Sequence, residues 1–150
     1  MSRMPAAMLT LAAIFILIMA APARSSTPSS DQAVITGMVR HYVSCFNRRD
    51  ADGILELYSP EARISDKGPF SSEWLDVGEY APRLRDKLAK YERRGAFIVG
   101  FDFERLEVRG DIAEVDIAVR ARQGIFSATR NGSFELAKEG DGWKIVMDDS

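Results

Sequence analysis

The hydrophobic pattern of this chain changes once, near Phe97, from a helical repeat to a repeat of two. Before that point apolar residues recur three and four positions apart, a spacing typical of amphipathic helices. After it they alternate with polar residues, which is typical of strands that bury one face. A group of helices followed by a group of strands predicts an α+β domain.

Two helices are expected in the first part of this pattern. Ser29 and Gln32 are spaced as a capping box, so the first helix should span residues 31–47. Asp50 is suited to cap a second helix, and Pro60 should end it. The apolar residues of the first helix form one stripe that should be buried: Ile35, Val39, Tyr42, Val43 and Phe46.

A short strand and a third helix should follow. The strand is predicted over residues 62–66. Asp76 and Glu79 again have capping-box spacing, so a helix is expected over residues 77–91, with a kink or a later start because of Pro82. Its basic residues should form the solvated face, the alternative being a ligand-binding basic patch: Arg83, Arg85, Lys87 and Lys90.

The alternating half of the chain predicts four long antiparallel strands, over residues 97–103, 113–121, 125–136 and 143–147. Gly110-Asp111 and residues 139–142 should form hairpin turns. Asn131 and Gly132 indicate a bulge or a sharp bend. The predicted fold is a cone-shaped α+β roll, with three N-terminal helices packed on a strongly bent antiparallel sheet and a cavity between the sheet and the first helix.

The N-terminus has the layout of a signal peptide. Arg3 provides a positive charge, residues 8–19 are almost entirely apolar, and Ala-Pro-Ala at 21–23 matches a signal-peptidase site. A retained single-pass anchor is the alternative. The apolar run is shorter than the about 20 residues that cross a bilayer, so we expect cleavage after residue 23.

Cleavage would leave residues 24–30 as a flexible, Ser-rich tether and residues 31–150 as one domain outside the cytoplasm, periplasmic or secreted. No stable membrane anchor would remain. The cleaved segment contains one basic residue, Arg3, so the formal charge would change from -2 to -3. Basic and acidic residues are interspersed, and we therefore expect no nucleic acid as a partner.

Cys45 is the single cysteine, so an internal disulfide is excluded. Its expected role is a small buried side chain of the first helix, the alternative being a nucleophile beside His41. His41 is the single histidine, and no cluster of His, Cys or carboxylate residues has metal-ligand spacing. We expect no metal and no cofactor.

Two blocks of the sequence carry a resemblance to a known family. They are YVSCFNRRDADGILELYSPEARISD, from Tyr42 to Asp66, and GDIAEVDIAV with FELAKEGDGWKIV near the end. In order and spacing they resemble the nuclear-transport-factor-2-like superfamily, in its SnoaL-like and ketosteroid-isomerase-like branch. The resemblance covers residues 31–150 and implies the roll described above, on which this superfamily carries several enzymes, ligand binders and interaction domains.

The resemblance to ketosteroid isomerase implies two candidate catalytic residues. Tyr42 matches the tyrosine that donates to the developing oxyanion, and Asp66 matches the aspartate that moves the proton. Gly132 stands where the isomerase has a second donor, with Asn131 beside it. The alternatives are that Tyr42 belongs to the core and that Asp66 begins a turn.

The resemblance also implies a mainly apolar ligand pocket, to which we assign four residues: Tyr58, Trp74, Phe101 and Asn131. The first hypothesis is an exported, non-catalytic module that binds a small hydrophobic molecule or serves an interaction role. The second is a proton-transfer enzyme that uses Tyr42 and Asp66. The third is a dimerisation or partner-binding module, and a weak homodimer through the outer sheet face is expected by analogy.

Overall fold

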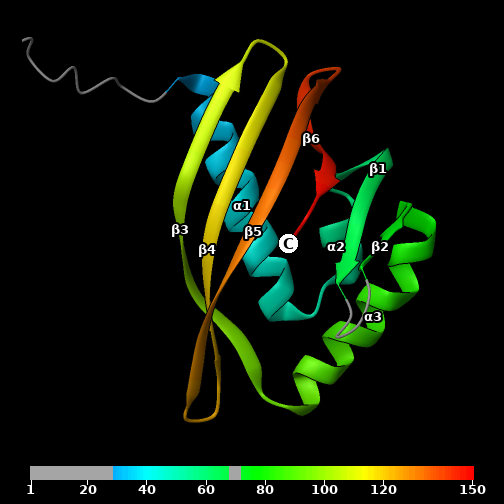
Figure 1. The fold of residues 1–150 in the computed structure, drawn as a ribbon, viewed down its shortest axis with the longest axis vertical. Helices are drawn as coiled ribbons and strands as arrows, with labels where there is room; N and C mark the ends of the chain where they lie inside the picture. Colours follow the sequence, from blue (N-terminus) through cyan, green and yellow to red (C-terminus); the bar gives the residue numbers. More distant parts are fainter. Residues whose placement is uncertain (1–28, 68–71) are drawn as a thin grey trace, which may run out of the picture.

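A computed structural model describes residues 29–67 and 72–150 (Figure 1). The predicted signal peptide, residues 1–23, and most of the predicted tether lie outside the described residues. The helices are α1 (Ser30–Arg48), α2 (Ala51–Leu55) and α3 (Val77–Arg93). The strands are β1 (Tyr58–Lys67), β2 (Ser72–Leu75), β3 (Ala96–Arg109), β4 (Ile112–Gln123), β5 (Phe126–Glu139) and β6 (Gly142–Asp148).

The predicted caps of the helices are confirmed. The Ser29 side chain accepts from the backbone of Gln32, and the Gln32 side chain accepts from the backbone of Ser29, so α1 begins with a capping box. Asp50 caps α2 through the backbone N–H of Gly53 at 2.9 Å. The second helix is shorter than predicted, because Pro60 lies within β1 and not at the end of a helix.

The third helix begins where its capping box predicts. Asp76 and Glu79 make both reciprocal hydrogen bonds, at 2.8 and 3.2 Å. The helix runs through Pro82, so the expected later start is wrong. Within the described residues, no helix is long and apolar enough to cross a membrane.

One mixed sheet of six strands has the order β2-β1-β6-β5-β4-β3. All neighbouring pairs are antiparallel except β1 and β6, which are parallel. The predicted antiparallel meander is confirmed, and the sheet differs from the predicted antiparallel arrangement in the one parallel pair. β1 comes before the β3–β6 meander in the chain. It pairs with β6, and the two strands run in the same direction. The sequence predicted no strand over the residues of β2.

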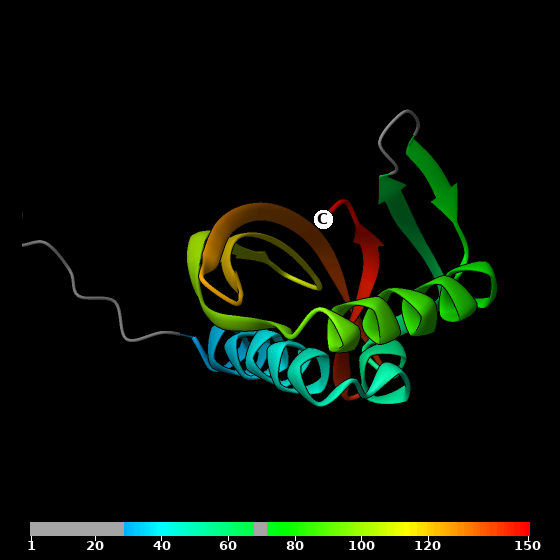
Figure 2. The same cartoon turned by 90° about the horizontal axis from the view of Figure 1, so that it is seen from below.

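The sheet curves over the helices as the predicted roll requires. Figure 2 shows the ribbons of β3, β4 and β5 arching over α1, with α3 under the other end of the sheet. The pairing of β4 with β5 continues without interruption through Ile117–Gly132 and Ala118–Asn131, so the expected bulge at Asn131 is absent there. The concave face and the three helices enclose one hydrophobic core, whose largest fully buried apolar side chains are Ile35, Ile54, Ile64, Leu75, Leu84, Leu88 and Val115.

Candidate functional site

The interior of the roll is nearly filled. A residual apolar cavity of about 10 Å³ lies between α1 and the sheet, lined by Met38, Val39, Tyr42, Leu57, Phe134, Leu136 and Ile145. Tyr42 reaches it beside Phe134, with ring centroids 5.9 Å apart. A cavity of this size holds about one water molecule, whereas small-molecule sites measure about 300–1,000 Å³.

A buried carboxyl group lies beside this filled interior. Asp148 is 1% exposed, and its Oδ2 accepts a hydrogen bond from the Tyr58 hydroxyl. Its Oδ1 accepts from the backbone N–H of Ser150 at 3.0 Å. Burial raises the pKa of Asp148 above its ordinary value, although the hydrogen bonds from Ser150 and Tyr58 act in the opposite direction.

Three buried tyrosines, Tyr42, Tyr58 and Tyr80, lie near enough to Asp148 for its charge to affect their pKa values. Tyr58 and Tyr80 pack with ring centroids 6.1 Å apart. Burial raises the pKa of Tyr42 and of Tyr58 well above the ordinary tyrosine value, and it raises the pKa of Tyr80 in the same direction. All three hydroxyls therefore stay protonated at neutral pH and can act only as hydrogen-bond donors and neutral acceptors.

The structure places Asp66 away from the cavity that Tyr42 lines. Asp66 Oδ2 accepts from Arg83 at 3.0 Å, and Oδ1 lies 3.8 Å from Lys87 Nζ. Both cations belong to α3, so the carboxylate is held on the outer part of the β1–α3 contact. A general base needs a free oxygen next to the substrate, and here both oxygens face cations.

The two residues of the expected oxyanion position lie on opposite sheet faces. Gly132 is buried, and a Cβ atom added to it would come within 2.9 Å of the Ser150 Cβ. Asn131 is exposed and precedes it by one position in β5, so its side chain lies on the outer face. The assignment of Asn131 to the pocket is therefore not supported by the geometry.

Cys45 and His41 lie within one turn of α1. Cys45 is fully buried, with its Sγ 3.4 Å from His41 Nε2 and 3.4 Å from Arg48 Nη2. Burial raises the pKa of the Cys45 thiol, which disfavours the reactive thiolate. In the two described ranges no group of three His, Cys, Asp or Glu side chains is arranged to hold a metal ion.

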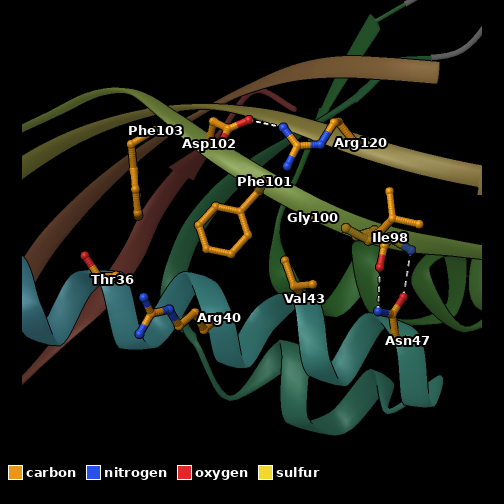
Figure 3. A pocket seen from close by; sticks show the side chains of 11 residues that line it. Thr36, Arg40, Val43, Asn47, Ile98, Gly100, Phe101, Asp102, Phe103 and Arg120 are labelled. Atoms are coloured by element: carbon orange, nitrogen blue, oxygen red, sulfur yellow. Dashed lines mark hydrogen bonds and ion pairs between the residues drawn. The ribbon is translucent and has the colours of Figure 1, made fainter. Parts of the chain in front are cut away.

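A larger space lies outside the core, along the groove between α1 and the edge strand β3 (Figure 3). This groove has a volume of about 630 Å³, which falls within the range of small-molecule sites. Its lining residues come mainly from these two elements: Thr36, Arg40, Val43, Asn47, Ile98, Val99, Gly100, Phe101, Asp102, Phe103 and Arg120. We call it the α1–β3 groove.

One end of the α1–β3 groove is closed by a side chain that pairs with the edge strand. Asn47 donates from Nδ2 to the carbonyl of Ile98 at 2.9 Å and accepts from the N–H of Ile98 at 2.8 Å. Both bonds are drawn in Figure 3. They satisfy backbone groups that an edge strand otherwise leaves to solvent, and they hold β3 against the helix.

The two arginines of the α1–β3 groove differ in whether they form an ion pair. Arg120 pairs with Asp102 across the outer side of β3. The guanidinium lies against Gly100, where a Cβ atom would come within 2.8 Å of Arg120 Nη2. Arg40 projects from α1 toward the groove (Figure 3), and none of the described carboxylates lies within ion-pair distance of it. The groove thus combines the aromatic side chain of Phe101 with the Arg40 guanidinium, which has no ion-pair partner among the described residues.

Of the four residues assigned to a pocket from the sequence, one lines the α1–β3 groove, and Arg40 was not among the four. Phe101 lines it, whereas Trp74 is 43% exposed on β2 and lines neither space described above. Tyr58 is buried in the core beside Asp148. Arg40 gave no signal in the sequence, because an exposed arginine on a helix is ordinary.

Comparisons with known proteins concern the fold. No family model matches the sequence, and no curated protein matches it. A protein of unknown function with a cystatin-like fold from Nostoc punctiforme gives a TM-score of 0.66 at 17% identity, covering 81% of this chain and 76% of that chain. An NTF-2-like protein of unknown function from Shewanella oneidensis gives 0.65 at 15% identity, covering 77% and 94%.

A third solved structure carries a functional description of its own. It is a putative calcium/calmodulin-dependent protein kinase type II association domain from Thiobacillus denitrificans, with a TM-score of 0.62 at 14% identity, covering 75% of this chain and 90% of that chain. At these identities the likeness establishes fold and not activity. The protein has the cystatin-like α+β fold of the nuclear-transport-factor-2-like proteins, as the sequence resemblance predicted.

Proposed function

We propose that this protein is an exported, non-catalytic module that binds a small, mainly hydrophobic molecule in the α1–β3 groove. The observation that carries the proposal is the difference between the two spaces. The groove measures about 630 Å³, and the interior cavity where an isomerase would hold its substrate measures about 10 Å³. Of these two spaces within the described residues, the groove is the one large enough for an organic ligand.

The placement of the isomerase-like residues supports a binding role over proton transfer. Tyr42 faces the small interior cavity, whereas Asp66 is paired with Arg83 and Lys87. A proton-transfer site needs its base and its oxyanion donor within reach of one substrate. Gly132 provides no second donor, and Ser150 packs against it.

The lining of the groove indicates the chemistry of its ligand. Phe101 and Val43 offer apolar contacts, and Arg40 offers a guanidinium without a described partner. A cation at the side of an apolar surface favours a ligand with an apolar body and one anionic group, since Arg binds carboxylates and similar anions well. Asn47 is occupied by Ile98 and is not available to the ligand.

The proposal can be tested with anilinonaphthalene sulfonate, a fluorescent aromatic anion. We expect saturable binding, and we expect NMR amide shifts confined to α1 and β3. Arg40→Gln should weaken binding by roughly fivefold to tenfold, because one charge-assisted contact is lost. Arg63→Gln is the matched control, since Arg63 is an exposed arginine on β1 outside the groove.

Two results would contradict the proposal. One is equal loss of binding in the Arg40→Gln and Arg63→Gln proteins, which would indicate a nonspecific charge effect. The other is a set of shifts that maps to the interior around Tyr42, which would return the ligand to the isomerase-like position.

Association of two copies is a second candidate role, favoured by the description of the Thiobacillus denitrificans structure as a putative association domain. Charged residues on the outer sheet face are already paired within the chain, since Arg105 lies 2.7 Å from Glu114 and 2.8 Å from Asp116. A dimer across this face would be polar and weak. Sedimentation that shows only monomer at high micromolar concentration would exclude it.

A further inference from the structure

The turn between β4 and β5 exposes two apolar residues at the tip of a hairpin. Ile125 is 89% exposed and Phe126 is 73% exposed, the two largest exposures among the large hydrophobic residues described. The hairpin ends at the lower edge of the molecule in Figure 1. Neither side chain belongs to the core cluster, so packing gives no reason for them to be apolar.

The other two hairpin turns of the same sheet show which residue types are sufficient for a turn of this kind to fold. Each of the three turns begins with a glycine at positive φ, namely Gly110, Gly124 and Gly140. The next residue is Asp111, Ile125 or Asp141. A two-residue turn of this kind accepts a polar second residue, and the chain itself uses aspartate twice. Ile125 is the exception, and its side chain is placed in solvent.

Positive charge surrounds the exposed pair. Residues 118–133 contain no acidic residue and three arginines: Arg120 is paired with Asp102, whereas Arg122 and Arg130 have no ion-pair partner among the described residues. Arg122 donates to the carbonyl of Gly124 at 3.0 Å, which keeps its guanidinium at the turn. Ala96 pairs with Gln123, so the exposed end of α3, with Arg93 and Arg94 next to Glu92, lies near the same tip and adds one net positive charge.

The opposite end of the sheet differs in charge. Its two turns contain Asp111 and Asp141, with Glu139 beside the second. Ile112 is exposed there too, at 42%, and it follows its turn as Phe126 follows Gly124-Ile125. Exposed apolar groups thus occur at both ends, and Arg109 precedes the Gly110-Asp111 turn, but of the three described turns only Gly124-Ile125 contains no acidic residue.

We propose that this tip binds an anionic lipid surface, with Ile125 and Phe126 entering the interface and Arg122 and Arg130 contacting lipid headgroups. Apolar side chains flanked by basic ones are the combination that interfacial membrane segments use. Long arginine stems suit this position, because they can lie along apolar surface while the charge stays in the headgroup layer. A two-residue tip offers far less than the about 800 Å² per partner that a specific protein interface buries.

The test is co-sedimentation with vesicles of phosphatidylcholine alone or mixed in equal parts with phosphatidylglycerol. The predicted mature chain, residues 24–150, is measured first. The full chain is measured separately, because its apolar residues 8–19 can bind lipid themselves. We expect binding to the anionic vesicles that falls as salt rises. Ile125→Asp copies the chain's own turns and should weaken binding by about tenfold or more while leaving the melting temperature unchanged.

Matched variants at the two ends of the sheet distinguish lipid binding by this tip from nonspecific binding by any exposed apolar residue. Phe126→Ser should weaken lipid binding, and Ile112→Ser at the opposite end should not. Arg122→Gln should weaken binding by roughly fivefold and reduce its salt dependence. The Ile125→Asp protein should still bind anilinonaphthalene sulfonate in the α1–β3 groove, so the two proposals can fail separately.

Three outcomes would overturn the proposal. Equal binding to both vesicle types would remove the role of the arginines. Equal effects of Phe126→Ser and Ile112→Ser would show that the tip is not special. Concentration-dependent self-association that disappears in the Ile125→Asp protein, without lipid binding, would assign the tip to a contact between copies.

Discussion

The hydroxyl of Tyr58 donates a hydrogen bond to the carboxyl group of Asp148, joining the first strand of the sheet to the last across the parallel β1–β6 boundary. Both residues are buried, and Asp148 is a polar group deep in the roll. A buried acceptor that loses its donor keeps its desolvation cost without compensation. The pair therefore links strands that are far apart in the chain.

Tyr58→Phe should destabilise the fold by about 2–3 kcal/mol, because it leaves the Asp148 oxygen without its side-chain donor. Urea unfolding measures this loss. Tyr91→Phe is the control: Tyr91 is partly buried and packs on Phe46, and its hydroxyl makes no hydrogen bond with the described residues. The control should change stability by less than about 0.5 kcal/mol. Equal losses in the two variants would contradict a specific role for the Tyr58 hydroxyl.

Asp148→Asn should change how stability depends on pH. Burial raises the pKa of Asp148 in the folded state, so folding favours its protonated form. Its stabilising contribution is complete below the ordinary aspartate pKa of about 3.9 and is lost as pH rises through the folded pKa. The stability of the variant relative to wild type should therefore increase from about pH 3 to about pH 7.

Asp149→Asn should show the opposite trend, and it serves as the control for the direction in which stability changes with pH. A hydrogen bond from Lys67 lowers the pKa of Asp149, so its contribution is present above the ordinary pKa and is lost as pH falls. Thermal melts at both pH values compare the two variants. A relative stability of the Asp148→Asn protein that falls with pH would show that hydrogen bonding, and not burial, dominates at Asp148.

Asn47→Ala should cost about 1–3 kcal/mol, because both backbone groups of Ile98 lose the partner that joins β3 to α1. Asn131→Ala is the matched control, an exposed asparagine on β5 that should cost less than about 0.5 kcal/mol. Chemical denaturation measures both. Hydrogen exchange should also show faster exchange of the Ile98 amide in the Asn47→Ala protein. An unchanged exchange rate would argue against a stabilising role for the Asn47–Ile98 hydrogen bonds.

Asp66→Asn should lower stability by at most about 1 kcal/mol, since its ion pair with Arg83 is partly exposed. The wild-type protein should convert a β,γ-unsaturated ketone no faster than buffer does. If Asp66 were a general base, the same change would reduce turnover by about 10² or more, and Tyr42→Phe would reduce it by a smaller factor. Wild-type turnover that Asp66→Asn abolishes would restore the isomerase hypothesis.

Export remains a prediction of the sequence. Expressed in a bacterium with a working secretion system, the protein should be recovered outside the cytoplasm with an N-terminus near Arg24. Intact-mass measurement checks this directly. An extracytoplasmic product that still carries residues 1–23 would instead favour a retained anchor.

Local sequence determined where the helices begin and where the long strands run. The capping boxes at Ser29 and Asp76 are satisfied within four residues, so their signals need no tertiary partner. The alternation in β4 likewise follows from one strand with one buried face. These features depend on neighbours in the chain, which the sequence displays directly.

Tertiary structure decided the contents of the interior and the location of the groove. Alternation from Trp143 and Ile145 would turn Asp148 outward, but the register between β5 and β6 shifts so that Phe134 pairs with Asp148 and the carboxyl group turns inward. The α1–β3 groove arises because β3 is the edge of the sheet, an order that no local pattern specifies. Strand order and register depend on contacts between distant segments, and a shift of one residue reverses which side chains are buried.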